Sequence, residues 1–140
     1  NSLIEASVKF SFKLNIGCPK KYEPNKTLLS WAQKNKGKIK VFNDIKKAAI
    51  SSDVLFTDKV ISMNDKVNKS KKLKDFEKFK ITSKVMSYLN PSAIFLHCLP
   101  RGSEVSNEVF LSKQSKVWQQ ALNRIYVQKS ILLYCFEKLR

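Results

Sequence analysis

The chain has 140 residues, of which 27 are Lys or Arg and 11 are Asp or Glu, so its formal net charge is +16. Hydrophobic residues make up 43% of the sequence, enough for one folded domain with a core. No apolar run is long enough to cross a membrane, so we expect no membrane partner. The excess charge is Lys spread over many segments, while Arg, which usually reads base edges, is scarce. We therefore expect a solvated basic surface without a specific nucleic-acid partner.

Apolar spacing and chain-breaking residues divide the sequence into alternating helices and strands. In chain order we predict a helix over 2–13, a strand over 14–18, a helix over 28–36 ended by Gly37, a strand over 39–42, a short helix to about residue 50 capped by Asn43 or Asp44, a strand over 54–57, helices over 67–78 and 84–89, a strand over 93–96, a short helix over 108–111, a last short strand over 117–118 and a terminal helix over 121–140.

This alternation predicts an α/β fold, a three-layer, doubly wound, Rossmann-like parallel sheet. Such a domain normally opens with a strand. The chain instead opens with a helix and without Met. We therefore expect a fragment whose sheet lacks its first strand.

Two of the predicted strands end in polar, reactive residues. The apolar run 54–57 leads into Asp58, and the apolar run 93–96 leads into His97 and Cys98. Ligands of open α/β sheets bind beyond the carboxyl ends of the strands, so Asp58 and Cys98 predict a site there. The alternatives are that Asp58 caps a helix or lies on the surface and that Cys98 is an inert buried thiol. Because neighbours on a strand point to opposite faces, we expect His97 to be a hydrogen-bonded structural residue and not the base of a dyad.

The three cysteines, Cys18, Cys98 and Cys135, are too far apart to form a zinc-binding pair. The sequence contains no other metal-ligand constellation and no Gly-rich phosphate loop, so we expect no metal and no cofactor. A reduced, cytoplasmic setting is the simpler interpretation of an odd number of cysteines. Cys18 and Cys135 lie in apolar surroundings and are expected to pack in the interior.

Five motifs, taken together, resemble those of the ornithine carbamoyltransferase family. Residues 95–100 resemble its HCLP motif, and the other four segments are 18–24, 57–63, 104–110 and 123–124. The resemblance implies that residues 1–140 are the ornithine-binding domain of such an enzyme, without its carbamoyl-phosphate domain. It implies transfer of the carbamoyl group from carbamoyl phosphate to the ornithine δ-amine, giving citrulline, with no cofactor and, at full length, in a homotrimer. The missing strand then belongs in the middle of the sheet, and the isolated fragment is expected to be inactive.

The resemblance also implies roles for individual residues in binding ornithine. Asp58 holds its ammonium end, and Cys98 places a thiol beside the reacting amine. Ser62 and the backbone of Met63 bind the α-amino and α-carboxylate groups.

For carbamoyl phosphate, the resemblance implies contacts from Cys98, from the Leu99 carbonyl and from Arg124. A guanidinium suits this ligand because it binds oxyanions in a bidentate manner. Arg101 is a weaker candidate for the same position. The catalytic set implied in this way is Cys98, Asp58 and Arg124.

Three positions depart from the family's pattern. Val60 stands where the family has Trp, Asn64 where it has Gly, and Leu122 where it has an acidic residue near the Arg. Two alternatives therefore stay open. One is a sibling transcarbamylase for another amine or amino acid, and the other is a basic binding module without catalysis.

Overall fold

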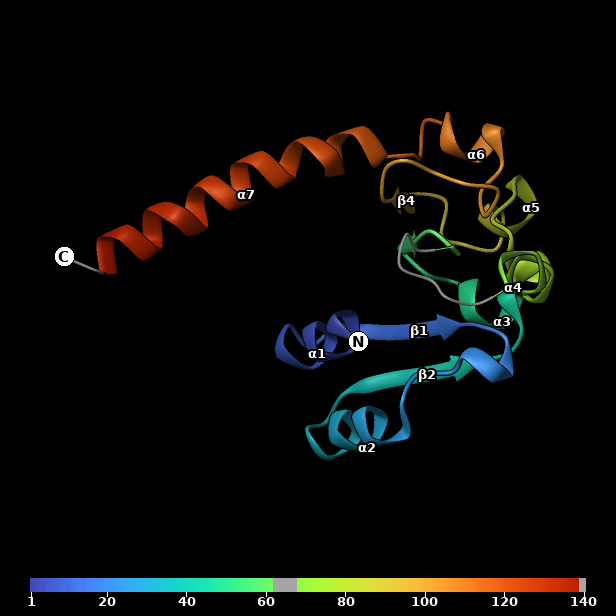
Figure 1. Cartoon of the computed structure of the whole chain (residues 1–140), viewed down its shortest axis with the longest axis horizontal. Helices are drawn as coiled ribbons and strands as arrows, with labels where there is room; N and C mark the ends of the chain where they lie inside the picture. Colours follow the sequence, from blue (N-terminus) through green and yellow to red (C-terminus); the bar gives the residue numbers. More distant parts are fainter. Residues whose placement is uncertain (62–67, 139–140) are drawn as a thin grey trace.

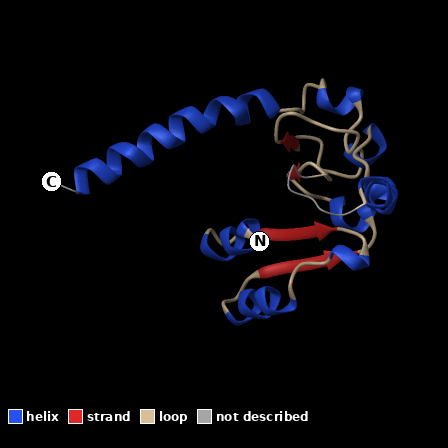
Figure 2. Ribbon diagram, in the orientation of Figure 1, coloured by secondary structure: helices blue, strands red, loops and turns tan. Residues whose placement is uncertain are grey.

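The computed structural model describes residues 1–61 and 68–138. Its strands are β1 (Lys13–Gly17), β2 (Lys38–Phe42), β3 (Val54–Thr57) and β4 (Ile94–His97). Its α-helices are α1 (Ser2–Lys9), α2 (Lys26–Lys34), α3 (Ile45–Ala49), α4 (Lys69–Phe76), α5 (Ser83–Met86), α6 (Asn107–Phe110) and α7 (Val117–Lys138), with short 3-10 helices η1 (Lys20–Tyr22) and η2 (Glu77–Phe79). Figures 1 and 2 show strands flanked by short helices, with α7 extending away from the rest of the molecule.

The strands form two parallel pairs, β1 with β2 and β3 with β4, and no strand within the described ranges joins the pairs. The prediction of a parallel α/β fold is confirmed, and the break between the pairs lies where the sequence predicts a missing strand. The register of β3 and β4 sets Thr57 opposite His97, so both strands end at the same level. The residues that follow them are therefore brought side by side.

The main core lies around β4 and fixes the end of this strand. Phe95 and Val117 are fully buried, and Val105 and Val109 are 1% and 2% exposed. On its other side β4 makes an isolated parallel bridge, between Phe95 and Ser115. Packing on both sides holds the strand that leads into the predicted site.

Two helices end earlier than predicted because single residues adopt a left-handed backbone. Helix α1 ends at Lys9 and not near residue 13, since Ser11 has a φ of 57° and turns the chain. After α2 it is Lys36, with a φ of 60°, that makes the corresponding turn. Gly37 serves a different purpose, because a Cβ there would lie 2.8 Å from the carbonyl oxygen of Ala32. It permits a close approach between backbones.

Helix α7 begins at Val117, so the predicted strand over 117–118 and the predicted helix start at 121 are both wrong. The sheet-like pairing stops at Ser115, and the buried Val117 already belongs to the first helical turn. Beyond Val117 these apolar side chains of the helix are exposed: Trp118, Leu122, Ile125, Tyr126, Val127, Ile131, Leu132, Leu133, Tyr134 and Phe136. No described helix is both long and apolar enough to cross a membrane.

The three cysteines differ in their surroundings. Cys18 is buried, as predicted, and Cys98 is half-buried. Cys135 is exposed, so the prediction that it packs in the interior is wrong. Its helix, α7, projects away from the other described elements at that point, and no surface of theirs covers the thiol (Figure 1).

Candidate active site

The two strand-end residues predicted to form a site are in contact. Asp58 directly follows β3 and Cys98 directly follows β4, and the matched register of the strands brings them together. The Cys98 thiol donates a hydrogen bond to Oδ1 of Asp58, with Sγ and Oδ1 2.9 Å apart. The same oxygen accepts from the Lys59 backbone amide at 2.7 Å. The structure thus presents a fixed carboxylate with a thiol beside it.

The electrostatics of this contact keep the carboxylate charged and the thiol neutral. The hydrogen bond from Cys98 lowers the pKa of Asp58, helped by the Lys59 amide and the positive field of His97. Desolvation, and then the hydrogen bond to Asp58, raises the pKa of Cys98. A neutral thiol is a poor nucleophile, so this arrangement favours binding of a cationic group over covalent catalysis by Cys98.

A buried hydrogen-bonded pair of side chains, which the sequence did not predict, lies behind this contact. His97 is 1% exposed and Glu104 is 7% exposed. Nε2 of His97 lies 3.0 Å from Oε1 of Glu104, and Nδ1 contacts the carbonyl oxygen of Cys98. Oε1 of Gln120, in α7, accepts a hydrogen bond from the His97 backbone amide at 3.0 Å. The expectation of a hydrogen-bonded structural His97 is confirmed, whereas the sequence contained no signal that Glu104 would be its partner.

The remaining predicted residues fall into two groups. Ser62, Met63 and Asn64 lie outside the described residues. Leu99 is 41% exposed, next to Cys98. Arg124 is exposed on α7, and no hydrogen bond or ion pair joins its guanidinium to another residue of the described ranges. The structure therefore brings together Asp58, Cys98 and Leu99, but not Arg124.

Arg101 is held by its own loop and by α6. Its guanidinium donates to the Val105 carbonyl oxygen at 3.2 Å and also contacts Oδ1 of Asn107. It lies over the ring of Phe110, 5.0 Å from the centroid. These contacts hold the Arg101 guanidinium within the protein and indicate a structural role for it.

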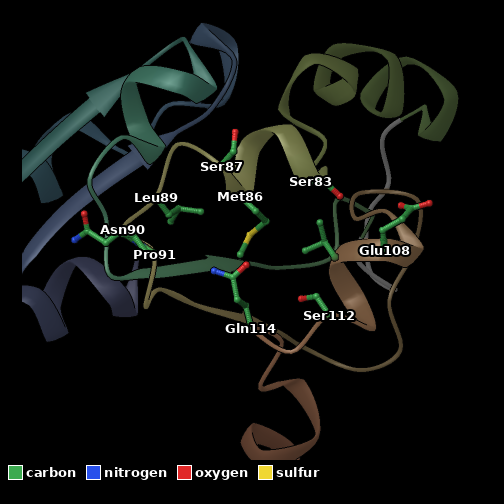
Figure 3. A pocket seen from close by; sticks show the side chains of 10 residues that line it. Ser83, Met86, Ser87, Leu89, Asn90, Pro91, Glu108, Ser112 and Gln114 are labelled. Atoms are coloured by element: carbon green, nitrogen blue, oxygen red, sulfur yellow. The ribbon is translucent and has the colours of Figure 1, made fainter.

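Two cavities lie outside the Asp58–Cys98 contact. The larger, of about 390 Å³, is bounded by α5, the turn before β4 and α6, and Figure 3 shows Glu108, Met86 and Gln114 around it. It does not include Asp58 or Cys98. The smaller, of about 320 Å³, adjoins the candidate site, because Val60 and Glu104 line it together with residues of α4. The polar groups of the candidate site converge at the Asp58–Cys98 contact and not in the larger cavity.

Comparison with known proteins shows which family the chain resembles. Residues 1–135 match the family model described as aspartate/ornithine carbamoyltransferase, Asp/Orn binding domain. The chain is 40% identical over 135 residues to an ornithine carbamoyltransferase of Methanocorpusculum labreanum, covering 95% of this chain and 44% of that protein.

Solved structures give the same result. The anabolic ornithine carbamoyltransferase of Campylobacter jejuni superposes with a TM-score of 0.89 at 35% identity, over 98% of this chain and 47% of that one. The ornithine carbamoyltransferase of Thermus thermophilus gives 0.79 at 33% identity, over 95% and 42%. The chain spans about half the length of the curated relatives it matches, with 44% to 48% of each covered.

Proposed function

Because this chain belongs to the aspartate/ornithine carbamoyltransferase family, whose Asp/Orn-binding domain it matches, we propose that it supplies the ornithine-binding half of an ornithine carbamoyltransferase. The observation that carries the proposal is the contact between Asp58 and Cys98 at the ends of two parallel strands. The whole enzyme transfers the carbamoyl group of carbamoyl phosphate to the δ-amine of ornithine, releasing citrulline and phosphate. No cofactor takes part in this proposal.

The chemistry requires an amine that has lost its extra proton. An alkylammonium group has a pKa of about 10.4 and carries no lone pair until it is deprotonated. In our proposal the charged Asp58 receives the ammonium end of ornithine, and the neutral Cys98 thiol lies beside the same nitrogen. The ammonium loses one proton to solvent, and the free amine then attacks the carbonyl carbon of carbamoyl phosphate. The bond from that carbon to the phosphate oxygen breaks, and the second proton lost from the nitrogen leaves with the phosphate. Positioning and electrostatic stabilisation supply most of the rate.

The other contacts complete the two substrate sites. Ser62 and the backbone of Met63 bind the α-amino and α-carboxylate groups of ornithine. The Leu99 carbonyl accepts a hydrogen bond from the carbamoyl NH2 group, and Arg124 neutralises charge on the phosphate. Arg124 acts only when the carbamoyl-phosphate domain is present, and that domain also covers the apolar surface of α7. We propose that the whole protein is a homotrimer.

A chimera tests this function directly. The present chain replaces the corresponding half of the Campylobacter jejuni enzyme, to which it superposes over 98% of its length. Citrulline formation from ornithine is compared with carbamoylation of N-acetylornithine, putrescine and aspartate. We expect kcat/KM for ornithine to exceed the others by at least about tenfold, since the charged contact at Asp58 is specific for a correctly placed ammonium.

Two departures from the family's pattern, both in the segment that follows Asp58, give a specific reason to test the other amines. Val60 and Asn64 replace the Trp and Gly expected from the family's pattern. If another amine reacts faster than ornithine, the chain belongs to a sibling transcarbamylase. If no amine reacts, the proposed function is wrong.

A further inference from the structure

We propose that Gln120 is a positioning residue of this site. Its side chain joins the end of β4 to the first turn of α7, and in this way it sets Arg124 relative to the segment that carries Cys98 and Leu99. This role rests on the proposed function, because Arg124 and the Leu99 carbonyl are the groups that we assign to carbamoyl phosphate. It can be tested by binding of that ligand, without any turnover.

The outer edge of β4 is paired with the segment that leads into α7. The Phe95 amide donates to the Gln114 carbonyl at 2.9 Å, and the Phe95 carbonyl accepts from the Lys116 amide at 2.9 Å. The Gln114 side chain also donates to the Ala93 carbonyl at 3.1 Å. Because every second residue of a strand directs its backbone groups to the same edge, the next amide on this edge is that of His97.

At this point the chain has already turned into a helix. Helix α7 begins at Val117, whose side chain is fully buried, so the chain no longer runs alongside β4 as a strand. The His97 amide instead donates to Oε1 of Gln120 at 3.0 Å. His97 is 1% exposed, and a buried amide without an acceptor is destabilising. The Gln120 side chain therefore replaces the carbonyl that a continuing strand would have supplied.

This hydrogen bond constrains the rotation of α7 about its own axis. Residues four apart lie one above the other on a helix, so Arg124 occupies the same face as Gln120, one turn further along α7. Turning the helix by one residue would swing that face by about 100°. No hydrogen bond or ion pair holds the Arg124 guanidinium within the described ranges, so its direction depends on how its helix is fixed.

An aromatic contact holds the same turn from another side. The ring of Trp118 meets that of Phe110 edge-on, with their centroids 6.0 Å apart. Trp118 and Gln120 are two residues apart, so they lie about 200° from each other around the helix. Trp118 is still 62% exposed, whereas a hydrogen bond weakens steeply once its angle is lost. Gln120 therefore supplies the more directional of the two constraints.

The consequence falls on carbamoyl phosphate and not on ornithine. In our proposal the Leu99 carbonyl holds the carbamoyl end of this ligand, and Arg124 holds its phosphate. These two groups belong to different segments, which Gln120 joins. Asp58 is less affected, because β3 is paired with the other edge of β4. Loss of the Gln120 contact should therefore weaken carbamoyl phosphate binding selectively.

Binding of carbamoyl phosphate to the chimera is measured by calorimetry. Gln120→Met keeps the length of the side chain and removes the acceptor. We expect it to weaken binding about threefold to tenfold, while KM for ornithine stays within about twofold. Gln128→Met, which alters an exposed glutamine further along α7, is the matched control and should change neither value. An equal rise in KM for ornithine would indicate a general loss of structure and overturn the positioning role.

A double-mutant cycle shows whether Gln120 acts through Arg124. We expect Arg124→Gln to weaken carbamoyl phosphate binding about tenfold to a hundredfold. Added to it, Gln120→Met should weaken binding by less than about twofold more, because the group that Gln120 orients is gone. Additive losses would show that Gln120 does not work through Arg124, and would overturn its positioning role.

Hydrogen exchange of the His97 amide reports the contact itself and needs no ligand. We expect slow exchange in the parent chimera, exchange at least about tenfold faster in Gln120→Met, and slow exchange in Gln120→Glu, which keeps an oxygen acceptor. An equal rate in the parent and in Gln120→Met would overturn the role. If thermal unfolding shows that Gln120→Met does not fold, Gln120→Asn replaces it, because that side chain is one methylene too short to reach the amide.

The outcomes separate the role of Gln120 from the proposed function. If the parent chimera forms no citrulline but binds carbamoyl phosphate, and Gln120→Met weakens that binding as expected, carbamoyl transfer is refuted and the positioning role stands. If citrulline is formed and Gln120→Met leaves carbamoyl phosphate binding unchanged, the function stands and the positioning role is wrong. A parent chimera that binds no carbamoyl phosphate refutes both.

Discussion

The ends of β3 and β4 and the helix α7 are built in opposite ways. At the strand ends, backbone pairing places Asp58 against Cys98, and the buried contact between His97 and Glu104 lies behind them. On α7, Arg124 and most of the apolar side chains are exposed, and no described residue bonds to the Arg124 guanidinium. The described part of the chain thus assembles the Asp58–Cys98 contact, which we propose to bind the amino acid. In our proposal the carbamoyl-phosphate half also depends on a second domain, since Arg124 has no partner for its guanidinium among the described residues.

The largest expected effect follows from this difference. We expect the 140-residue chain alone to form no detectable citrulline at saturating substrates, whereas the chimera with a carbamoyl-phosphate domain turns over. Loss of the fixed orientation between two substrates can cost about 7–11 kcal/mol of barrier. Turnover by the isolated chain as a monomer, comparable to that of the chimera, would refute the division of the site between two domains.

The second prediction concerns α7 itself. We expect the isolated chain to self-associate, because the helix exposes a long apolar surface. Replacing Ile125, Leu132 and Phe136 together by Gln should shift the chain towards monomer in sedimentation or light scattering. Lys129→Gln, on the same helix, is the control. If the triple variant associates as before, the unpaired edges of β1 and β3 are responsible and not α7.

The third prediction addresses the charge at the strand ends. Asp58→Asn in the chimera should weaken the apparent affinity for ornithine at least tenfold, because a charge-assisted bond worth about 1.5–3 kcal/mol is lost. The KM for carbamoyl phosphate should change little. Asp53→Asn, at the other end of β3, where the side chain accepts from Asn90, is the control. An unchanged response to ornithine would remove Asp58 from the site.

Features with local causes were predictable, and features that depend on distant contacts were not. The bounds of β3 and a helix cap at Asn43 or Asp44, which the structure assigns to Asp44, were predicted correctly, because an apolar run and a capping side chain are local signals. The contact of Asp58 with Cys98 followed from strand ends in a parallel sheet. The pairing of His97 with Glu104 joins a strand to an irregular loop, and no periodicity in the sequence reports it.

The errors have the same origin. The left-handed turn at Ser11 shortens α1, although nothing in its residue type demands that backbone. The start of α7 at Val117 was missed because two apolar residues can begin a strand or a helix alike. Cys135 was expected inside because its neighbours are apolar, yet no described element packs over it. An apolar segment indicates that its side chains need a packing partner, but it does not identify the surface that packs against them.

A smaller effect is expected from Cys98→Ser. The hydroxyl of Ser can donate to Asp58 as the thiol does, so the fold and the carboxylate should be preserved. Turnover should fall by about threefold to thirtyfold, since the shorter, more polar group changes the surroundings of the amine. The measurement is kcat and KM for ornithine in the chimera, with Cys135→Ser as control. Full activity after alkylation of Cys98 would rule out a role beside the reacting amine.

The smallest effect concerns the reactivity of the Cys98 thiol. Burial and the hydrogen bond to Asp58 raise its pKa, so the folded state favours the neutral thiol. This contribution to stability is present below the pKa of the unfolded thiol and is lost as the pH rises through the folded value. Asp58→Asn removes the negative acceptor, so the pKa of Cys98 should fall towards its ordinary value, and more thiolate should be present at pH 8.

Iodoacetamide labelling followed by mass spectrometry measures this change. We expect Cys98 to react about twofold to fivefold faster in Asp58→Asn than in the unaltered chain, because the thiolate is the reacting species. The exposed Cys135 in the same sample is the internal reference, and its rate should stay constant. A slower or unchanged reaction of Cys98 would mean that the thiol does not sense the Asp58 charge. The two strand ends would then be neighbours without the electrostatic coupling on which the proposed ornithine site depends.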